Sequence, residues 1–308
     1  MPDHPPVRRA LSASAIGLLL ALVALFAWQL ANRDNNAFRD ALRAGKTPEA
    51  PAFTLPRLDH AGTISRQSLA GHAAVLNFWA SWCPPCADEA PDLNALSIRY
   101  EAQGVRFVGV DFNDAVDEAR AFAKRHDVPY ALVHDTRGVR QAFGVTGPPE
   151  TYVLDGTGHA VVHIEGPVDA PLLEPYLRVA IARSGGAAPL DPATPIGGGK
   201  LSSMSGTPLL IAFVTPNCGD CGALLQRATA LRGHARVIAL SESGVVQGAA
   251  ADPPDTTGRG GGATQRALGV TAFPALLAID GRGRLVAALS GLPAAATVRA
   301  AVRRAGAA

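Results

Sequence analysis

One stretch constrains the fold of this chain more than any other: the apolar run 75–79, which ends shortly before two cysteines, Cys83 and Cys86. The run is β-branched and aromatic apart from Asn77, which is typical of a central strand with both faces covered. Residues 87–90 read as the first turn of a helix, with acids where the helix dipole favours them. The first cysteine therefore lies between a strand and a helix N-terminus, where free backbone N–H groups stabilise a thiolate.

The cysteine pattern favours redox chemistry over a structural role. All four cysteines lie in two C-x-x-C pairs, and the second pair is Cys218 and Cys221. A passive disulfide or half a zinc site is the alternative, but zinc needs two further Cys or His ligands nearby, and the sequence around each pair supplies none. His159 and His163 are interpreted as solvated hairpin residues. We expect no metal and no cofactor other than the redox-active disulfides themselves.

Charge and hydropathy indicate a membrane anchor rather than a nucleic-acid partner. The chain has 28 basic and 26 acidic residues, without a basic cluster. After a short N-tail, residues 1–10, the segment 11–31 carries no charge and is long enough to span a bilayer as a helix. A cleaved signal peptide is the alternative, but the apolar run is long for one and no small-x-small cleavage site ends it.

The orientation of this anchor is indicated less directly. Arg8 and Arg9 precede the span, and a short basic tail before a first span remains in the cytoplasm in most proteins. Four basic residues follow the span and favour the opposite orientation: Arg33, Arg39, Arg43 and Lys46. We predict a single-pass protein whose C-terminal domains lie outside the cytoplasm.

The rest of the chain is predicted to form two α/β domains of the same kind. In each half a strand, a C-x-x-C, a helix, a second strand, a Gly-Val-Thr followed by proline, a strand hairpin and a helix occur in this order. The predicted boundaries are a tether at 32–47, a first domain at 48–183, a mobile linker at 184–200, and a second domain at 201–308 with a disordered loop at 241–263.

The first half resembles the membrane-anchored thioredoxin-like reductases of the TlpA/ResA/CcmG type. The resemblance rests on the run 77–86, on Glu89 and Pro91, and on the run 144–151. The second half resembles a diverged thioredoxin-like domain, and its Phe-x-Thr-Pro-x-Cys-x-x-Cys run is similar to that of MauD-type maturation proteins. The resemblance implies tandem thioredoxin-like domains, each a central mixed sheet with helices on both faces.

The resemblance also implies roles for single residues. Pro149 would follow a cis bond and face the first cysteine pair, and Pro274 would take that place in the second domain. Cys83 would be the exposed nucleophile and Cys86 the resolving cysteine. Glu89 would accept the proton of Cys86, although a solvated first-turn acid is the alternative. Substrate docking is assigned to the residues around the first cysteine: Trp82, Pro84 and Pro85.

The second pair departs from this pattern. The positions of Asn77, Glu89 and Pro91 are taken by residues that supply no acid: Ala212, Leu224 and Gln226. Asp220 lies between the two cysteines and disfavours a nearby thiolate, so we expect a higher pKa for Cys218 than for Cys83. This pair could relay electrons to the first pair, act on its own target, or be vestigial.

The predicted function is reduction of substrate protein disulfides in an oxidising compartment. By resemblance the targets would be cytochrome c apoproteins or copper-site cysteines, and the electron donor a membrane thiol reductant. The alternatives are a thiol-based copper metallochaperone, a net oxidase or isomerase, and a peroxidase. A peroxidase would need a threonine where this chain has Ala80.

Overall fold

The computed structural model describes most of the chain. The described residues are 22–23, 36–196, 199–204, 206–215, 218–241, 244–245 and 261–307. The predicted membrane span 11–31 lies outside them, apart from Leu22 and Val23. No helix formed by these residues is both long and apolar enough to cross a bilayer.

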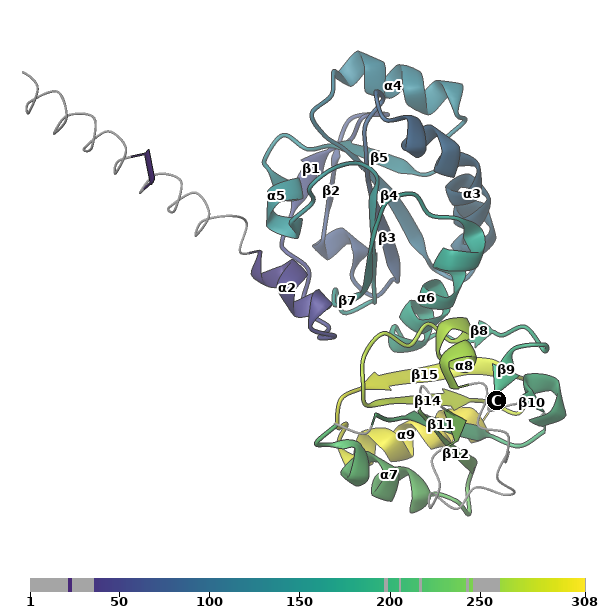
Figure 1. Ribbon diagram of the computed structural model, residues 1–308. Coiled ribbons are helices and arrows are strands. Elements are labelled where there is room, and N and C mark those ends of the chain that lie inside the picture. Colours follow the sequence, from purple (N-terminus) through teal and green to yellow (C-terminus); the bar gives the residue numbers. More distant parts are fainter. Residues whose placement is uncertain are drawn as a thin grey trace, which may run out of the picture.

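The first sheet has the strand order β5-β4-β3-β6-β7 (Figure 1). Its strands are β3 (Ala74–Trp79), β4 (Arg106–Asp111), β5 (Ala131–His134), β6 (Glu150–Leu154) and β7 (Ala160–Glu165). The first three run parallel, β6 is antiparallel to β3, and β7 returns antiparallel to β6. Every residue of β3 is buried, as expected for a central strand covered on both faces. The mixed α/β sheet predicted for the first half is confirmed.

Helices cover both faces of this sheet. One face carries α3 (Pro84–Glu101), α4 (Val116–Arg125) and α6 (Ala170–Arg183). The other face carries α2 (Ala37–Arg43), α5 (Val139–Phe143) and the hairpin of β1 (Thr54–Pro56) with β2 (Thr63–Ser65). Aromatic rings fill this second layer, where Phe38, Phe78, Phe143 and Tyr152 pack edge to face or tilted.

The second sheet repeats the strand order of the first. Its order is β13-β12-β11-β14-β15-β8, and its members are β11 (Leu209–Phe213), β12 (Arg236–Ser241), β13 (Gly244–Val245), β14 (Ala275–Ile279), β15 (Arg284–Ser290) and β8 (Ala188–Pro189). β11 and β12 are parallel, β14 is antiparallel to β11, and β15 is antiparallel to β14. One face is covered by α7 (Cys221–Thr229) and α9 (Ala295–Gly306).

The other face of the second sheet packs against the first domain. A single apolar cluster extends from Val153 and Val161 of the first sheet, through Leu173 and Leu177 of α6, to Leu277 of the second. Figure 1 shows α6 at the junction of the two domains, with α8 (Gly261–Ala267) beside it. The two domains therefore share a core, and α6 is buried on both sides.

The segment 184–200 was predicted to be a mobile linker, and this prediction is wrong. Ala188, Leu190 and Ile196 are each less than a tenth exposed and belong to the shared core. β8 joins the second sheet beside β15, and β9 (Pro195–Ile196) pairs with β10 (Gly199–Lys200). The sequence analysis missed these three apolar residues because each stands alone among the Gly and Pro residues of this segment.

Two further boundaries differ from the prediction. The tether 32–47 includes α2, whose Arg39 is buried and donates from Nη1 to the carbonyl of Gly144 at 2.6 Å, so its described part packs on the first domain. The predicted disordered loop 241–263 includes β13 and the start of α8. Residues 246–260 of that loop lie outside the described part.

Candidate active site

The first cysteine pair lies at the junction of β3 and α3. Cys83 is the N-cap residue of α3, with an extended backbone (φ −98°, ψ 105°). The predicted first turn at 87–90 is wrong, because the helix already begins at Pro84 and its first turn carries no acid. The two sulfurs form a disulfide of 2.04 Å, and the N–H of Cys86 donates to Cys83 Sγ at 3.2 Å. Pro84 and Pro85 occupy the first helical turn, where a missing N–H removes no helical hydrogen bond. The sulfur of Cys83 thus faces a backbone donor and the positive end of a helix.

Cys83 is not exposed, contrary to the prediction. In the disulfide form both cysteines are 3% exposed, because the sulfur of Cys83 turns inward to bond Cys86. The exposed surface is formed by its neighbours. Trp82 is 56% exposed, and Pro84 and Pro85 are also exposed.

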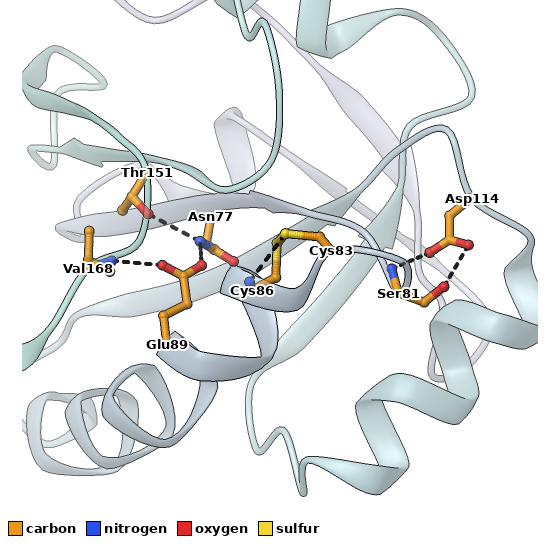
Figure 2. Close-up of a disulfide and its surroundings, with 8 residues drawn as sticks. All are labelled: Asn77, Ser81, Cys83, Cys86, Glu89, Asp114, Thr151 and Val168. Carbon is orange, nitrogen blue, oxygen red and sulfur yellow. Dashed lines mark hydrogen bonds between the residues drawn. A yellow bond between two sulfur atoms is a disulfide. The ribbon is translucent and has the colours of Figure 1, made fainter.

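Glu89 is the buried carboxylate nearest to this pair in the chain. It is 2% exposed, so the alternative of a solvated first-turn acid is wrong. Its Oε1 accepts from the side-chain amide of Asn77 at 2.8 Å, and its Oε2 accepts from the N–H of Val168 at 2.9 Å. Asn77 also donates to the hydroxyl of Thr151 at 3.1 Å. In Figure 2 the amide of Asn77 stands between the Glu89 carboxylate and the disulfide.

The surroundings of Glu89 leave it able to change charge near neutral pH. Burial raises the pKa of Glu89 to about 7, although the hydrogen bonds from Val168 and Asn77 act in the opposite direction. Both partners are neutral. A carboxyl group with this pKa can accept a proton from a thiol and return it at physiological pH.

A second buried glutamate orders the loop before β6. The Pro148–Pro149 peptide bond is cis, as the resemblance implies. Oε1 of Glu150 accepts from the N–H groups of Thr146 and Gly147, and its Oε2 lies 2.7 Å from Nε2 of His163. Burial alone would raise the pKa of Glu150, but these hydrogen bonds, that of His163 foremost, hold it below its usual range. Glu150 therefore stays charged.

His163 is not the solvated hairpin residue that the sequence suggested. Its side chain is 6% exposed and stacks on the ring of Tyr152, with ring centroids 4.1 Å apart. Register explains the error, because Tyr152 and His163 are opposite each other in the β6–β7 pair. A histidine stacked on an aromatic partner can be buried on a strand that looks half polar.

The second cysteine pair also forms a disulfide and lies at the matching junction of β11 and α7. The Phe273–Pro274 peptide bond is cis. Around this pair Ala212 and Leu224 are fully buried and belong to the apolar core. They occupy the places that Asn77 and Glu89 hold in the first domain. The second pair therefore lacks the Asn–Glu network of the first.

Comparison with known proteins identifies the family. A profile of the AhpC/TSA family matches residues 47–163. A thiol:disulfide interchange protein DsbE homolog of Paracoccus denitrificans is 36% identical over 161 residues, which are 49% of this chain and 86% of that protein. The chain belongs to the DsbE family of thiol:disulfide interchange proteins.

Further members of the DsbE family agree with this assignment. DsbE of Escherichia coli is 36% identical over 148 residues, covering 46% of this chain and 77% of that protein. The thiol-disulfide oxidoreductase ResA of Bacillus thuringiensis is 30% identical over 131 residues, covering 42% and 75%. The resemblance stated from the sequence is confirmed, and the chain is an oxidoreductase of the thiol–disulfide class.

The sequence did not reveal how Glu89 is held. The N–H of Val168 lies 79 residues away in the chain and is a backbone group, so no residue type marks it. Asn77 was noted only as the polar exception in an apolar run, whereas its amide contacts Glu89 directly. An isolated polar residue in the middle of an apolar central strand was the one available signal for this contact.

Proposed function

We propose that this protein reduces disulfides in substrate proteins outside the cytoplasm through Cys83 and Cys86. The observation that supports this most is the buried Glu89 carboxylate, which joins α3 to Asn77 at the base of the disulfide. A base with a pKa of about 7 assists deprotonation of a resolving thiol, which is the step that releases a reduced substrate.

The reaction begins with the reduced pair. The thiolate of Cys83 attacks one sulfur of the substrate disulfide, a mixed disulfide forms, and the other substrate sulfur leaves as a thiolate. The N–H of Cys86 and the helix N-terminus stabilise the attacking thiolate. The exposed rings of Trp82, Pro84 and Pro85 form the surface against which the substrate docks, and cis-Pro149 is proposed to border the pair, as the family resemblance implies.

The second step regenerates the substrate thiol. Glu89 accepts the proton of Cys86, whose thiolate attacks the sulfur of Cys83 and displaces the second substrate thiolate. Two electrons have passed from the protein to the substrate, and the protein is left with the Cys83–Cys86 disulfide. Glu89 then gives up its proton to solvent, and its carboxylate again accepts the hydrogen bond of the Asn77 amide.

The setting of this reaction is part of the proposal. The segment 11–31 is proposed as a single membrane span, which places the domains on the outer side of the cell membrane. A membrane thiol reductant would return electrons to the pair, and cytochrome c apoproteins or copper-site cysteines would be the substrates. The repeated strand order supports a second thioredoxin-like domain in the second half of the chain.

The second pair is proposed to act apart from the first. The second domain contacts the first near the amino end of β3, where the hydroxyl of Thr271 lies 3.3 Å from the carbonyl of Val161. Cys83 follows the carboxyl end of β3, about 16 Å further along the strand. We favour a separate target over direct relay, because the first pair lies toward the end of its sheet that is remote from this contact.

The redox potential of the first pair tests the direction of the reaction. In a Cys218→Ser/Cys221→Ser variant, which isolates the first pair, we expect a potential of about −200 to −270 mV in a glutathione titration, as in reducing thioredoxin-like proteins. Cys83→Ser in the same variant should abolish reduction of a peptide disulfide. A potential near −120 mV, that of strong oxidants, would overturn the reductase proposal, and turnover by Cys83→Ser would overturn the nucleophile.

A further inference from the structure

A second buried carboxyl group lies at the end of β4, apart from Glu89. Asp111 is fully buried, and its Oδ2 is 2.6 Å from Nδ1 of His134 at the end of the neighbouring β5. Its Oδ1 has no hydrogen-bond donor among the described residues. A buried carboxylate oxygen without a donor is costly, so this oxygen needs a proton or a proton-bearing neighbour.

The neighbouring acid, Asp114, holds the segment that carries Cys83. Its Oδ2 accepts from the N–H of Ser81 at 2.5 Å, and its Oδ1 accepts from the hydroxyl of Ser81 at 2.9 Å (Figure 2). The carbonyl of Asn113 accepts from the indole N–H of Trp82 at 3.0 Å. Three hydrogen bonds accepted by residues 113–114 thus fix Ser81 and Trp82, the two residues that precede the nucleophile.

The two acids interact with each other. Burial raises the pKa of Asp111 to about 7; His134 opposes this shift, while the charge and the hydrogen-bonding contact of Asp114 add to it. Two carboxylates that interact in this way do not both ionise without a penalty, and such a pair holds one proton over a range of pH. The proton satisfies the Oδ1 of Asp111 that has no other donor.

Within the described part of the chain, His134 is the basic side chain that pairs with these acids. His134 faces Asp111 from β5, and from β3 the buried indole N–H of Trp79 has no acceptor. The nearest arginines are directed elsewhere. From α4, Arg120 donates to the carbonyl of Leu58, and from α5, Arg140 lies over the ring of Phe112.

We propose that Asp111 is a positioning residue for thiol–disulfide exchange: a proton shared between Asp111 and Asp114 holds the Asp114 carboxylate on Ser81, and thereby holds Cys83 in place for attack. Loss of that proton makes the two carboxylates repel each other, which draws Asp114 away from Ser81 and loosens the residues before Cys83. The inference rests on the proposed role of Cys83 as nucleophile. Asp111 contacts neither cysteine in any hydrogen bond of the described residues and acts only through Asp114.

The test follows attack by Cys83 alone. The full chain carries Cys86→Ser, Cys218→Ser, Cys221→Ser and Glu89→Gln, so Cys83 is its only thiol. Among the described residues Asp111 is then the remaining carboxyl group whose pKa burial raises to about 7. The second-order rate with an aromatic probe disulfide is measured from pH 5 to 9 and divided by the thiolate fraction from ultraviolet absorbance. This normalised rate should fall by about tenfold as pH rises through 7, because small displacements of a reacting atom cost rate steeply.

Substitutions at the pair separate positioning from a merely structural role. Asp111→Asn and Asp114→Asn each remove one carboxylate and keep an acceptor, so the normalised rate should stay at its high value at every pH. Asp114→Ala removes the acceptor of Ser81 and should give the low value at every pH. Asp117→Asn is the control, because this acid near the start of α4 is exposed and should leave the fall at pH 7 unchanged.

The outcomes are distinguishable from failure of the proposed function. If Cys83 does not react at any pH, the nucleophile assignment fails. If it reacts and the fall persists in the Asp111→Asn variant, only the positioning role is overturned. Should Asp111→Asn not fold, Asp114→Asn decides alone, and a fall that persists there overturns the inference equally.

Discussion

Two buried glutamates of the first domain, Glu150 on β6 and Glu89 on α3, have opposite properties. Glu150 receives hydrogen bonds from two backbone N–H groups and from His163, and these hold its pKa below the usual range. Glu89 receives hydrogen bonds only from Asn77 and Val168, and burial raises its pKa to about 7. Environment alone therefore assigns one carboxylate to structure and leaves the other available for proton transfer.

The first prediction at this scale concerns the resolving step. Below pH 7 Glu89 is protonated and cannot accept the proton of Cys86, so resolution of a preformed mixed disulfide at Cys83 should accelerate as pH rises through about 7. Glu89→Gln should slow resolution by about 10²-fold or more and remove this inflection. Stopped-flow release of a coloured thiol measures both.

The control for Glu89→Gln is Glu101→Gln, which changes an exposed acid at the end of the same helix. It should leave the rate and the inflection as in the parent protein. An inflection near pH 7 that survives in the Glu89→Gln variant would exclude Glu89 as the proton acceptor.

At the scale of elements, α6 is the part whose position the sequence determined least. A closing helix at 171–182 was predicted and α6 is present, but its second buried face was not foreseen. The run 179–182 holds four consecutive apolar residues, all less than a tenth exposed, and the sequence alone did not show which elements would cover them. Such a run is typical of a helix that is buried on all sides.

Elements defined by local signals were predicted best. The strand before Cys83 and the β6–β7 hairpin follow from an apolar run and an Asp-Gly turn, which act over a few residues. The contacts of Glu89, Asp111 and His163 join residues distant in the chain and depend on register between strands. Such pairings are fixed only by the assembled sheet, so the sequence showed the residue types without their partners.

Close backbone contact between α6 and the second domain gives a prediction for Gly269. This residue has φ +65°, and a Cβ on it would lie 2.8 Å from the backbone carbon and oxygen of Pro175 in α6. Gly269→Ala should therefore destabilise the full chain by more than the roughly 1–3 kcal/mol expected for backbone strain alone, and should expose the amides of α6 to hydrogen exchange.

Gly291→Ala is the matched control for this substitution. Gly291 has a similar φ of +71°, with no atom within 4 Å of an added Cβ, so its variant carries the strain without the clash. Equal losses in midpoint of guanidinium unfolding for the two variants would show that α6 does not press on the second domain at this point.

At the scale of the whole molecule, the first disulfide lies toward the end of its domain that is remote from the second domain. Figure 1 shows α4, which follows the carboxyl end of β4, at the end of the first domain remote from the second. Cys83 follows the carboxyl end of the parallel strand β3 and so lies toward the same end, whereas the contact of Thr271 with Val161 is made near the amino end of that strand. The first pair is thus directed away from the contact between the domains.

This arrangement predicts that electrons do not pass between the pairs within one molecule. When protein reduced only at Cys218–Cys221 is prepared, its first pair should become reduced at a rate proportional to protein concentration, as in a bimolecular reaction. Thiol trapping and mass spectrometry at several dilutions give this dependence. A rate independent of concentration would demonstrate internal relay and contradict the proposed separation.

The shared core also bears on how this polypeptide can be divided. Cutting the chain after α6 would leave the leucines of that helix facing water in one fragment, and would strip the matching face of the second sheet in the other. Both fragments would expose large apolar surfaces that promote aggregation. The two activities should therefore be separated by substituting one cysteine pair at a time in the full-length chain.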